Sequence, residues 1–131
     1  HYLAKMFKKD GVKTVYPGLQ EHPSHNLYQM IINKEYGFGG MLTIDVGTLK
    51  KANKLMEKMQ KNNIGYLAVS LGFYKTLFCA PKSSTSSEIS EAEQKEMGLT
   101  EGLIRFSVGL DNDIKRTYEI IRKCMKELKI I

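Results

Sequence analysis

The sequence predicts a small α+β domain, in which a mostly antiparallel sheet carries helices on one face. Two kinds of stretch point to this class: longer ones with apolar residues at helical spacing, and short ones rich in β-branched and aromatic residues. Glycine, proline and asparagine separate the stretches. With 131 residues, of which 42% are hydrophobic, the chain is long enough for one core. We therefore expect residues 1–131 to form a single domain.

The first half of the chain predicts three helices and two strands. Leu3, Met6 and Phe7 have helical spacing, and no N-cap or initiator Met precedes them, which suggests a piece of a longer protein. Residues 12–16 predict a strand, and Ser24 is expected to cap a short helix with Leu27, Met30 and Ile31 along one side. The strand at 41–46 alternates in polarity. The helix at 48–63 is the clearest, with an apolar face of Ala52, Leu55, Met56 and Met59.

The second half predicts strands at 64–71 and 76–80, a short helix, the strand within 98–109 and a final helix. Ser90 and Glu93 have the spacing of a capping box, and Gly98 closes that helix. Asp113 is expected to cap the last helix. The residues of this last helix that are predicted to face the core are Ile114, Tyr118, Ile121, Met125 and Leu128. The sheet interior is expected to hold Leu42, Ile44, Leu67, Val69, Ile104, Phe106 and Val108, packed against Leu55, Met59, Ile121 and Leu128.

Arg105 lies inside the apolar stretch that runs from Leu103 to Val108. Arginine is seldom buried unless another group pairs with it. One interpretation is an arginine at a strand edge, reaching water or paired with an acid of its own domain. The other is an arginine directed into a cleft, where its planar fork binds a carboxylate or phosphate. The pattern alone leaves both interpretations open.

Composition narrows the class of protein. No apolar run is long enough to span a bilayer, and nothing resembles an export signal. Cys79 and Cys124 form no metal or disulfide signature, so we expect reduced thiols and a cytoplasmic location. His22 and His25 have metal-ligand spacing but no third ligand nearby, so no metal site is predicted. The net charge of +6 comes from scattered lysines and does not itself indicate nucleic-acid binding.

Five motifs resemble the Cys/Met-metabolism family of pyridoxal-phosphate enzymes. They occur in the family's order and cover most of the chain. They are V-Y-P-G-L at 15–19 followed by H-P-x-H at 22–25, G-F-G-G-M-L at 37–42, S-L-G at 70–72, the Ser/Thr-rich loop at 81–87, and G-L-T-E-G-L-I-R-F-S-V-G at 98–109. The motifs match only the C-terminal domain of those fold-type I enzymes.

The resemblance implies a role for Arg105. In the family the matching arginine binds the α-carboxylate of the substrate, with the serine of S-L-G beside it, here Ser70. Thr85 matches a loop threonine that borders the same site. Ser86 stands where the family usually has histidine. The resemblance therefore does not define the shape of this loop or which proton-donating groups it carries. The resemblance therefore predicts a carboxylate site for a sulfur amino acid.

The resemblance also places the cofactor outside this chain. The family's lysine that binds pyridoxal phosphate lies in a larger preceding domain, and no lysine here stands in a matching motif. Lys75 and Lys82 look like loop lysines. We therefore expect no catalytic or cofactor-binding residue here, an inactive isolated fragment, and a longer parent that is a homotetramer like its family.

Val69 bears on the substrate. Family members that act on cystathionine usually have a glutamate at this position, where it meets the distal amino group. An apolar side chain suits an uncharged tail such as that of methionine, because a distal ammonium would stay unpaired. This favours α,γ-elimination by a carbon–sulfur lyase of the methionine γ-lyase type. Cystathionine γ-synthase or γ-lyase and O-acylhomoserine sulfhydrylase are the alternatives, and a non-catalytic RNA-binding module is a remote one.

Overall fold

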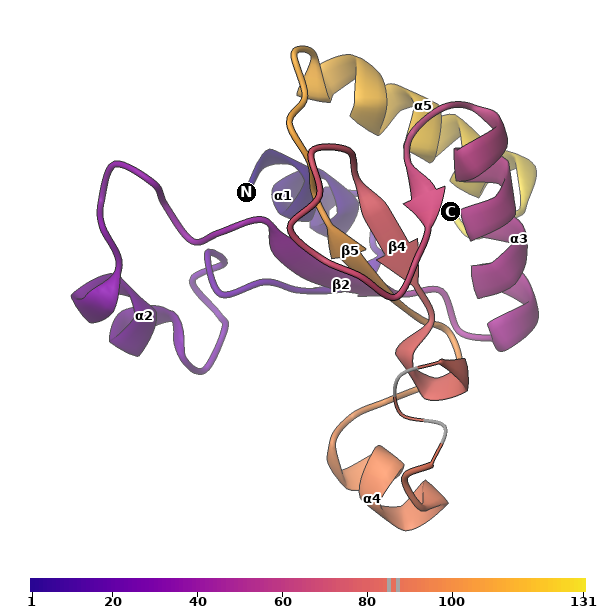
Figure 1. Ribbon diagram of the computed structural model, residues 1–131, viewed down its shortest axis with the longest axis horizontal. Coiled ribbons are helices and arrows are strands. Elements are labelled where there is room, and N and C mark those ends of the chain that lie inside the picture. Colours follow the sequence, from indigo (N-terminus) through magenta and orange to yellow (C-terminus); the bar gives the residue numbers. More distant parts are fainter. Residues whose placement is uncertain (85, 87) are drawn as a thin grey trace.

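A computed structural model describes residues 1–84, 86 and 88–131. The elements follow each other as expected for an α+β chain (Figure 1). They are α1 (Tyr2–Lys9), β1 (Lys13–Val15), α2 (His25–Ile31), β2 (Met41–Asp45), α3 (Leu49–Lys61), β3 (Tyr66–Leu67), β4 (Leu77–Cys79), the 3-10 turn η1 (Pro81–Ser83), α4 (Glu91–Glu96), β5 (Leu103–Ser107) and α5 (Ile114–Glu127). No helix within these residues has the length and apolar character needed to cross a membrane.

The described strands form one sheet in the order β1-β2-β5-β4-β3. Neighbouring strands are antiparallel except β3 and β4, which are parallel. Helices α1, α3 and α5 cover one face of the sheet, while α2 and α4 project away from the body of the molecule (Figure 1). The predicted fold class is confirmed.

The core lies between the sheet and these three helices. Leu42, Ile44, Ile104 and Phe106 are buried, and so are Leu55, Met59 and Ile121 from the helices, as predicted. Val108 and Leu128 are partly buried and pack against this cluster. The alternation of the central strands places every second side chain in the core, so the residues between them lie on the opposite, open face.

Helix capping follows the sequence closely. Asp113 accepts a hydrogen bond from the Arg116 amide at 3.0 Å, and the capping box of Ser90 and Glu93 is present. Ser24 precedes α2 as predicted, but its side chain makes no capping hydrogen bond. Leu27, Met30 and Ile31 are exposed, because α2 does not pack against the sheet.

The predicted strand at 64–71 is wrong over most of its length. Only Tyr66 and Leu67 pair with β4, and the chain leaves the sheet at Ala68. Leu67 and Val69, expected in the core, are 43% and 54% exposed. The apolar run does not continue as a strand because residues 68–74 turn back across the open face, where they meet β5 (Figure 1).

Candidate functional site

Arg105 lies in the middle of β5, on the face of the sheet that faces away from the helices. The register places it opposite Thr43 on β2 and Cys79 on β4. Its neighbours in sequence, Ile104 and Phe106, point into the core and are fully buried. The alternation of this strand therefore directs one cation onto the open face, and Arg105 is half-buried there.

The guanidinium of Arg105 is held by main-chain oxygens. Its Nη2 donates to the carbonyl of Val69 at 3.1 Å and to the carbonyl of Ser70 at 3.0 Å. Among the described residues, no carboxylate forms an ion pair with Arg105 and no group accepts a hydrogen bond from its buried Nε. The cation is thus oriented by neutral oxygens, without a described counter-charge.

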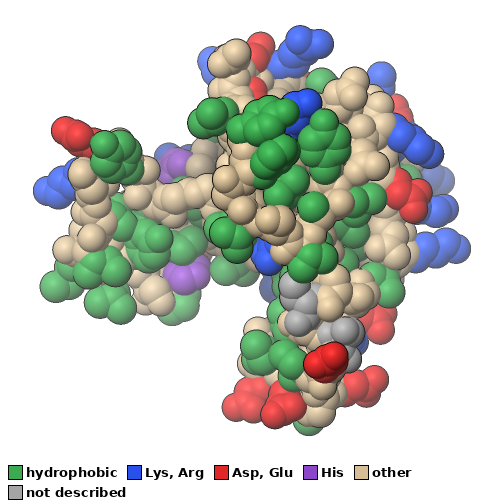
Figure 2. All heavy atoms as spheres, in the orientation of Figure 1, with side chains coloured by type: hydrophobic (Ala, Val, Ile, Leu, Met, Phe, Trp, Pro, Cys, Tyr) green, Lys and Arg blue, Asp and Glu red, His purple; other side chains and the backbone are tan. Residues whose placement is uncertain are grey.

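The Val69–Ser70 turn approaches Arg105 with its backbone rather than with its side chains. Ser70 meets the guanidinium through its carbonyl, and the side chain of Val69 is exposed. Figure 2 shows hydrophobic side chains gathered over the loop that crosses the sheet. The exposed apolar residues of this segment are Tyr66, Leu67, Val69, Leu71, Phe73 and Tyr74.

The remaining predicted site residue, Thr85, lies outside the described residues. Its neighbour Ser86 donates from its amide to the carbonyl of Pro81 at 2.9 Å. The carbonyl of Ser86 accepts a hydrogen bond from Gln94 Nε2 at 2.8 Å, and the same amide nitrogen donates to Ile89. Buried Gln94 thus anchors the Ser/Thr-rich loop to α4, a role that sequence reasoning missed.

Ser107 is the second residue that sequence reasoning missed. It is 6% exposed, and its hydroxyl accepts a hydrogen bond from the Gly72 amide at 3.1 Å. A signal for it was present, because residues two apart on a strand share a face and Ser107 follows Arg105 by two. Arg105 and Ser107 therefore both contact the same turn.

The lysines nearest to these residues in sequence both have polar partners within the domain. Lys75 donates to the Tyr66 hydroxyl at 3.1 Å, and this hydrogen bond raises the pKa of Lys75. A lysine that forms an imine needs a depressed pKa. Lys82 pairs with Glu101 at 3.6 Å. Neither contact points to a role in binding the cofactor, and no chemical step is assigned to these lysines.

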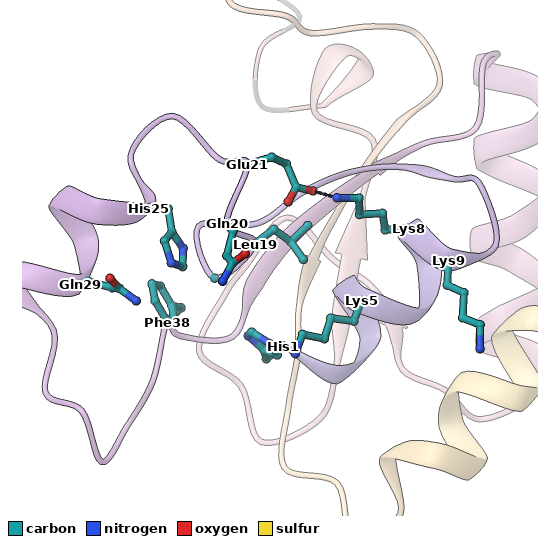
Figure 3. Close-up of a pocket in the computed structure, with 11 residues that line it drawn as sticks. His1, Lys5, Lys8, Lys9, Leu19, Gln20, Glu21, His25, Gln29 and Phe38 are labelled. Atoms are coloured by element: carbon teal, nitrogen blue, oxygen red, sulfur yellow. Dashed lines mark hydrogen bonds and ion pairs between the residues drawn. The ribbon is translucent and has the colours of Figure 1, made fainter.

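A cavity of about 660 Å³ lies between α1 and α2, away from Arg105 (Figure 3). Within it Lys8 pairs with Glu21, and His25 stacks on Phe38 with ring centroids 5.0 Å apart. Nδ1 of His25 is 2.8 Å from the carbonyl of Pro17, to which it donates as the Nδ1–H tautomer. These residues satisfy one another and contribute nothing to the Arg105 site.

The Arg105 arrangement suits an anion with two oxygens. An arginine fork makes charge-assisted hydrogen bonds to carboxylates, which are stronger than those between neutral groups. Main-chain carbonyls on one nitrogen fix the plane of the fork before a ligand arrives. The geometry is therefore that of a pre-oriented cation at the edge of an apolar surface.

Comparison with solved structures agrees with the fold. The chain is similar to a crystal structure assigned to an O-acetylhomoserine (thiol)-lyase from Campylobacter jejuni, with a TM-score of 0.83 and 27% sequence identity. The match covers 95% of this chain and 29% of the other, and that structure carries a pyridoxyl-lysine phosphate. The neighbour supports the assignment to a fold-type I enzyme domain.

Curated relatives point to the same family. The chain is 41% identical over 121 residues to methionine γ-lyase from Arabidopsis thaliana, a match that covers 92% of this chain and 27% of the relative. It is 34% identical to cystathionine γ-lyase from Bacillus subtilis over 74% of this chain and 24% of that relative. It thus spans about a quarter of the length of these relatives. The sequence model of the family of Cys/Met metabolism PLP-dependent enzymes matches residues 1–119, and the chain belongs to that family.

Proposed function

We propose that this chain is the C-terminal, substrate-binding domain of a longer pyridoxal-phosphate-dependent carbon–sulfur lyase that acts on methionine. One observation carries the proposal: Arg105 is a half-buried cation, oriented by two main-chain carbonyls and without a carboxylate partner among the described residues. Such a group suits an amino-acid carboxylate. The family membership supplies the reaction class, a lyase of sulfur amino acids.

Arg105 binds the α-carboxylate of the substrate, and the Val69–Ser70 carbonyls orient the guanidinium before the carboxylate binds. Holding the carboxylate fixes the rotation of the substrate about its α-carbon, which decides which bond is presented for reaction. When bound by the rest of the protein, pyridoxal phosphate supplies the electron sink for that bond cleavage. The family motifs assign Ser70 and Thr85 to the border of the carboxylate site. This chain thus contributes orientation, and the longer protein contributes the reacting groups.

The exposed side chain of Val69 favours an uncharged substrate tail. A tail that ends in a thioether meets an apolar wall at low cost, whereas a distal ammonium at the same place lacks a counter-ion. This observation supports α,γ-elimination on methionine or a related S-alkyl homocysteine.

An O-acetylhomoserine sulfhydrylase is the second candidate, because the structural neighbour is assigned that activity. A substrate panel on the longer parent protein separates the candidates. We expect kcat/KM to be highest for L-methionine elimination, measured as thiol release. A higher value for L-cystathionine, or for sulfide addition to O-acetylhomoserine, would reject the methionine assignment. The homotetramer and the cytoplasmic location stay predictions.

A further inference from the structure

The turn formed by residues 69–73 is not held in place by side-chain packing. The side chains of Val69, Leu71 and Phe73 are 54%, 62% and 45% exposed. A segment with so few buried contacts depends on hydrogen bonds for its position. The carbonyls that orient Arg105 belong to this turn, so whatever positions the turn also positions the guanidinium.

One end of the turn is anchored to β4 and the other to the loop that follows β5. The Ala68 amide donates to the carbonyl of Phe78 at 3.1 Å, and the Leu110 amide donates to the carbonyl of Tyr74 at 2.8 Å. Between these anchors, the hydrogen bonds from the described residues of the rest of the domain are those of Arg105 and Ser107. Two side chains of one strand therefore hold the middle of the turn.

Ser107 is built for this contact. Its hydroxyl lies under the turn and accepts from the Gly72 amide at 3.1 Å. Gly72 has φ of +74°, a left-handed conformation that favours glycine and bends the chain toward the strand at this point. The hydrogen bond from the Gly72 amide to the Ser107 hydroxyl, together with the backbone bend at Gly72, fixes the distance of the turn from β5.

We propose that Ser107 is a positioning residue of the carboxylate site. A bound carboxylate competes with the Val69 and Ser70 carbonyls for the guanidinium N–H groups, and this weakens the hold of Arg105 on the turn. The Ser107–Gly72 hydrogen bond then keeps the two carbonyls, and with them Arg105, in position. This inference rests on the proposed function, because it concerns the affinity of the site for a carboxylate.

The test uses two unreactive ligands of the longer parent protein. L-Norleucine has the length of methionine without the sulfur, and pentan-1-amine is the same molecule without the carboxylate. The inhibition constant of pentan-1-amine divided by that of L-norleucine measures what the carboxylate contributes to binding. Loss of one neutral hydrogen bond predicts that Ser107→Ala lowers this ratio about three- to tenfold. Ser107→Thr keeps the hydroxyl and restores the ratio.

Three further variants complete the experiment. Thr48→Ala is the matched control. It removes a hydroxyl that accepts a hydrogen bond from the Lys51 amide at 3.2 Å, and it is expected to leave the ratio unchanged. Ser107→Cys keeps the shape with a weaker acceptor and serves if Ser107→Ala does not fold; an intermediate ratio supports the proposal. Arg105→Ala is expected to lower the ratio more than Ser107→Ala or Ser107→Cys.

The outcomes separate the two proposals. Suppose that Arg105→Ala lowers the ratio, but that the Ser107 variant which folds leaves the ratio unchanged, because it weakens the binding of neither ligand or of both equally. Ser107 is then structural only, and this inference is overturned while the carboxylate site stands. If Arg105→Ala leaves the ratio unchanged, the carboxylate site itself is wrong, and the role of Ser107 falls with it.

Discussion

Arg105 combines a fixed orientation with a charge that no carboxylate among the described residues pairs with. Two neutral carbonyls of the Val69–Ser70 turn hold its Nη2, whereas Arg122 in the same domain pairs with Asp10 at 3.0 Å. A structural arginine resembles the second case, because a carboxylate offsets the cost of removing the cation from water. The contrast favours a ligand as the missing counter-charge of Arg105.

Replacing Arg105 tests this at the residue scale. Arg105→Lys keeps the charge but cannot make the two parallel hydrogen bonds of the fork. In the longer parent we expect a loss of about 1.5–3 kcal/mol from one charge-assisted bond, or roughly ten- to a hundredfold in kcat/KM. Arg105→Ala costs more. Steady-state kinetics and the melting temperature are measured on the same variants.

Stability separates the two interpretations of Arg105. A carboxylate-binding arginine gives a variant with a nearly unchanged melting temperature and weakened substrate binding. If Arg105→Ala instead melts much earlier, while its folded fraction binds the substrate normally, the arginine is structural and the proposed site is wrong.

Val69 tests the choice of substrate. Val69→Glu introduces a carboxylate at an exposed position, which pairs with a distal ammonium and opposes an apolar tail. We expect the ratio of kcat/KM for L-cystathionine to that for L-methionine to rise by about tenfold or more. Val69→Leu is the control, with an unchanged preference. An equal effect of Val69→Glu on both substrates would show that residue 69 does not contact the tail.

At the scale of elements, α3 and α5 hold the sheet through apolar faces of similar design. Leu55 and Met59 from α3 and Ile121 and Met125 from α5 are almost completely buried. Leu55→Ala is expected to destabilise the domain by about 2–5 kcal/mol, because the lost methyl groups leave a cavity in the core. Lys54→Ala, on the exposed face of α3, is the control. Urea unfolding of the chain measures both, and an equal effect of the two changes would contradict the layer assignment.

Helices α1 and α5 are joined by a polar contact. The Tyr118 hydroxyl donates to Asp10 Oδ2 at 2.5 Å, and burial together with this bond raises the pKa of Tyr118 to about 12. The folded protein therefore holds the phenol proton more tightly than the unfolded chain, whose tyrosine pKa is about 10. The resulting stability is complete below pH about 10 and is lost as the pH rises through about 12.

Tyr118→Phe tests whether the Tyr118 proton stabilises the fold and whether this stability is lost as the pH rises. The variant lacks the ionisable group, so its melting temperature should fall less between pH about 10 and 12 than that of the wild type. Thermal melts over that range measure the difference between the two proteins. Parallel curves would mean that the Tyr118 proton is held no more tightly in the folded state than in the unfolded chain.

At the scale of the whole molecule, the proposed function assigns to this chain one part of a divided site. Arg105, the proposed carboxylate-binding group, lies on the open face of the sheet, beside the exposed apolar residues of the 66–74 segment (Figure 2). Lys75, which lies in that region, has a raised pKa because it donates a hydrogen bond to the Tyr66 hydroxyl, and no lysine of this chain stands in the family's cofactor motif. The cofactor and the reacting groups are therefore expected on the remainder of the longer protein.

The isolated chain tests this division. Mixed with equimolar pyridoxal phosphate, it is expected to fold but to form no stoichiometric adduct that borohydride can reduce. Mass spectrometry after borohydride treatment measures this, with the longer parent as the positive control. A single lysine modified in full would place the cofactor site within residues 1–131 and contradict the proposed division.

The sequence by itself determined the helices and the central strands. The apolar spacing of α3 and α5 and the alternation of β2 and β5 reflect contacts within a few residues and the burial of one face. The family motifs also identified Arg105 and Ser70 as neighbours, and the contact of Arg105 with the Ser70 carbonyl agrees with this. These features are local, or are carried by residue identity.

The tertiary structure alone decided where residues 64–71 go. A short apolar run reads equally well as a strand or as a turn that crosses a sheet, so Leu67 and Val69 were assigned to the core and are exposed. The course of this segment depends on the bond from Gly72 to Ser107, 35 residues away, and on the close passage of Gly109, where a Cβ would lie 2.4 Å from the Tyr74 carbonyl oxygen. Local periodicity cannot encode such long-range contacts, and they place the backbone carbonyls that orient Arg105.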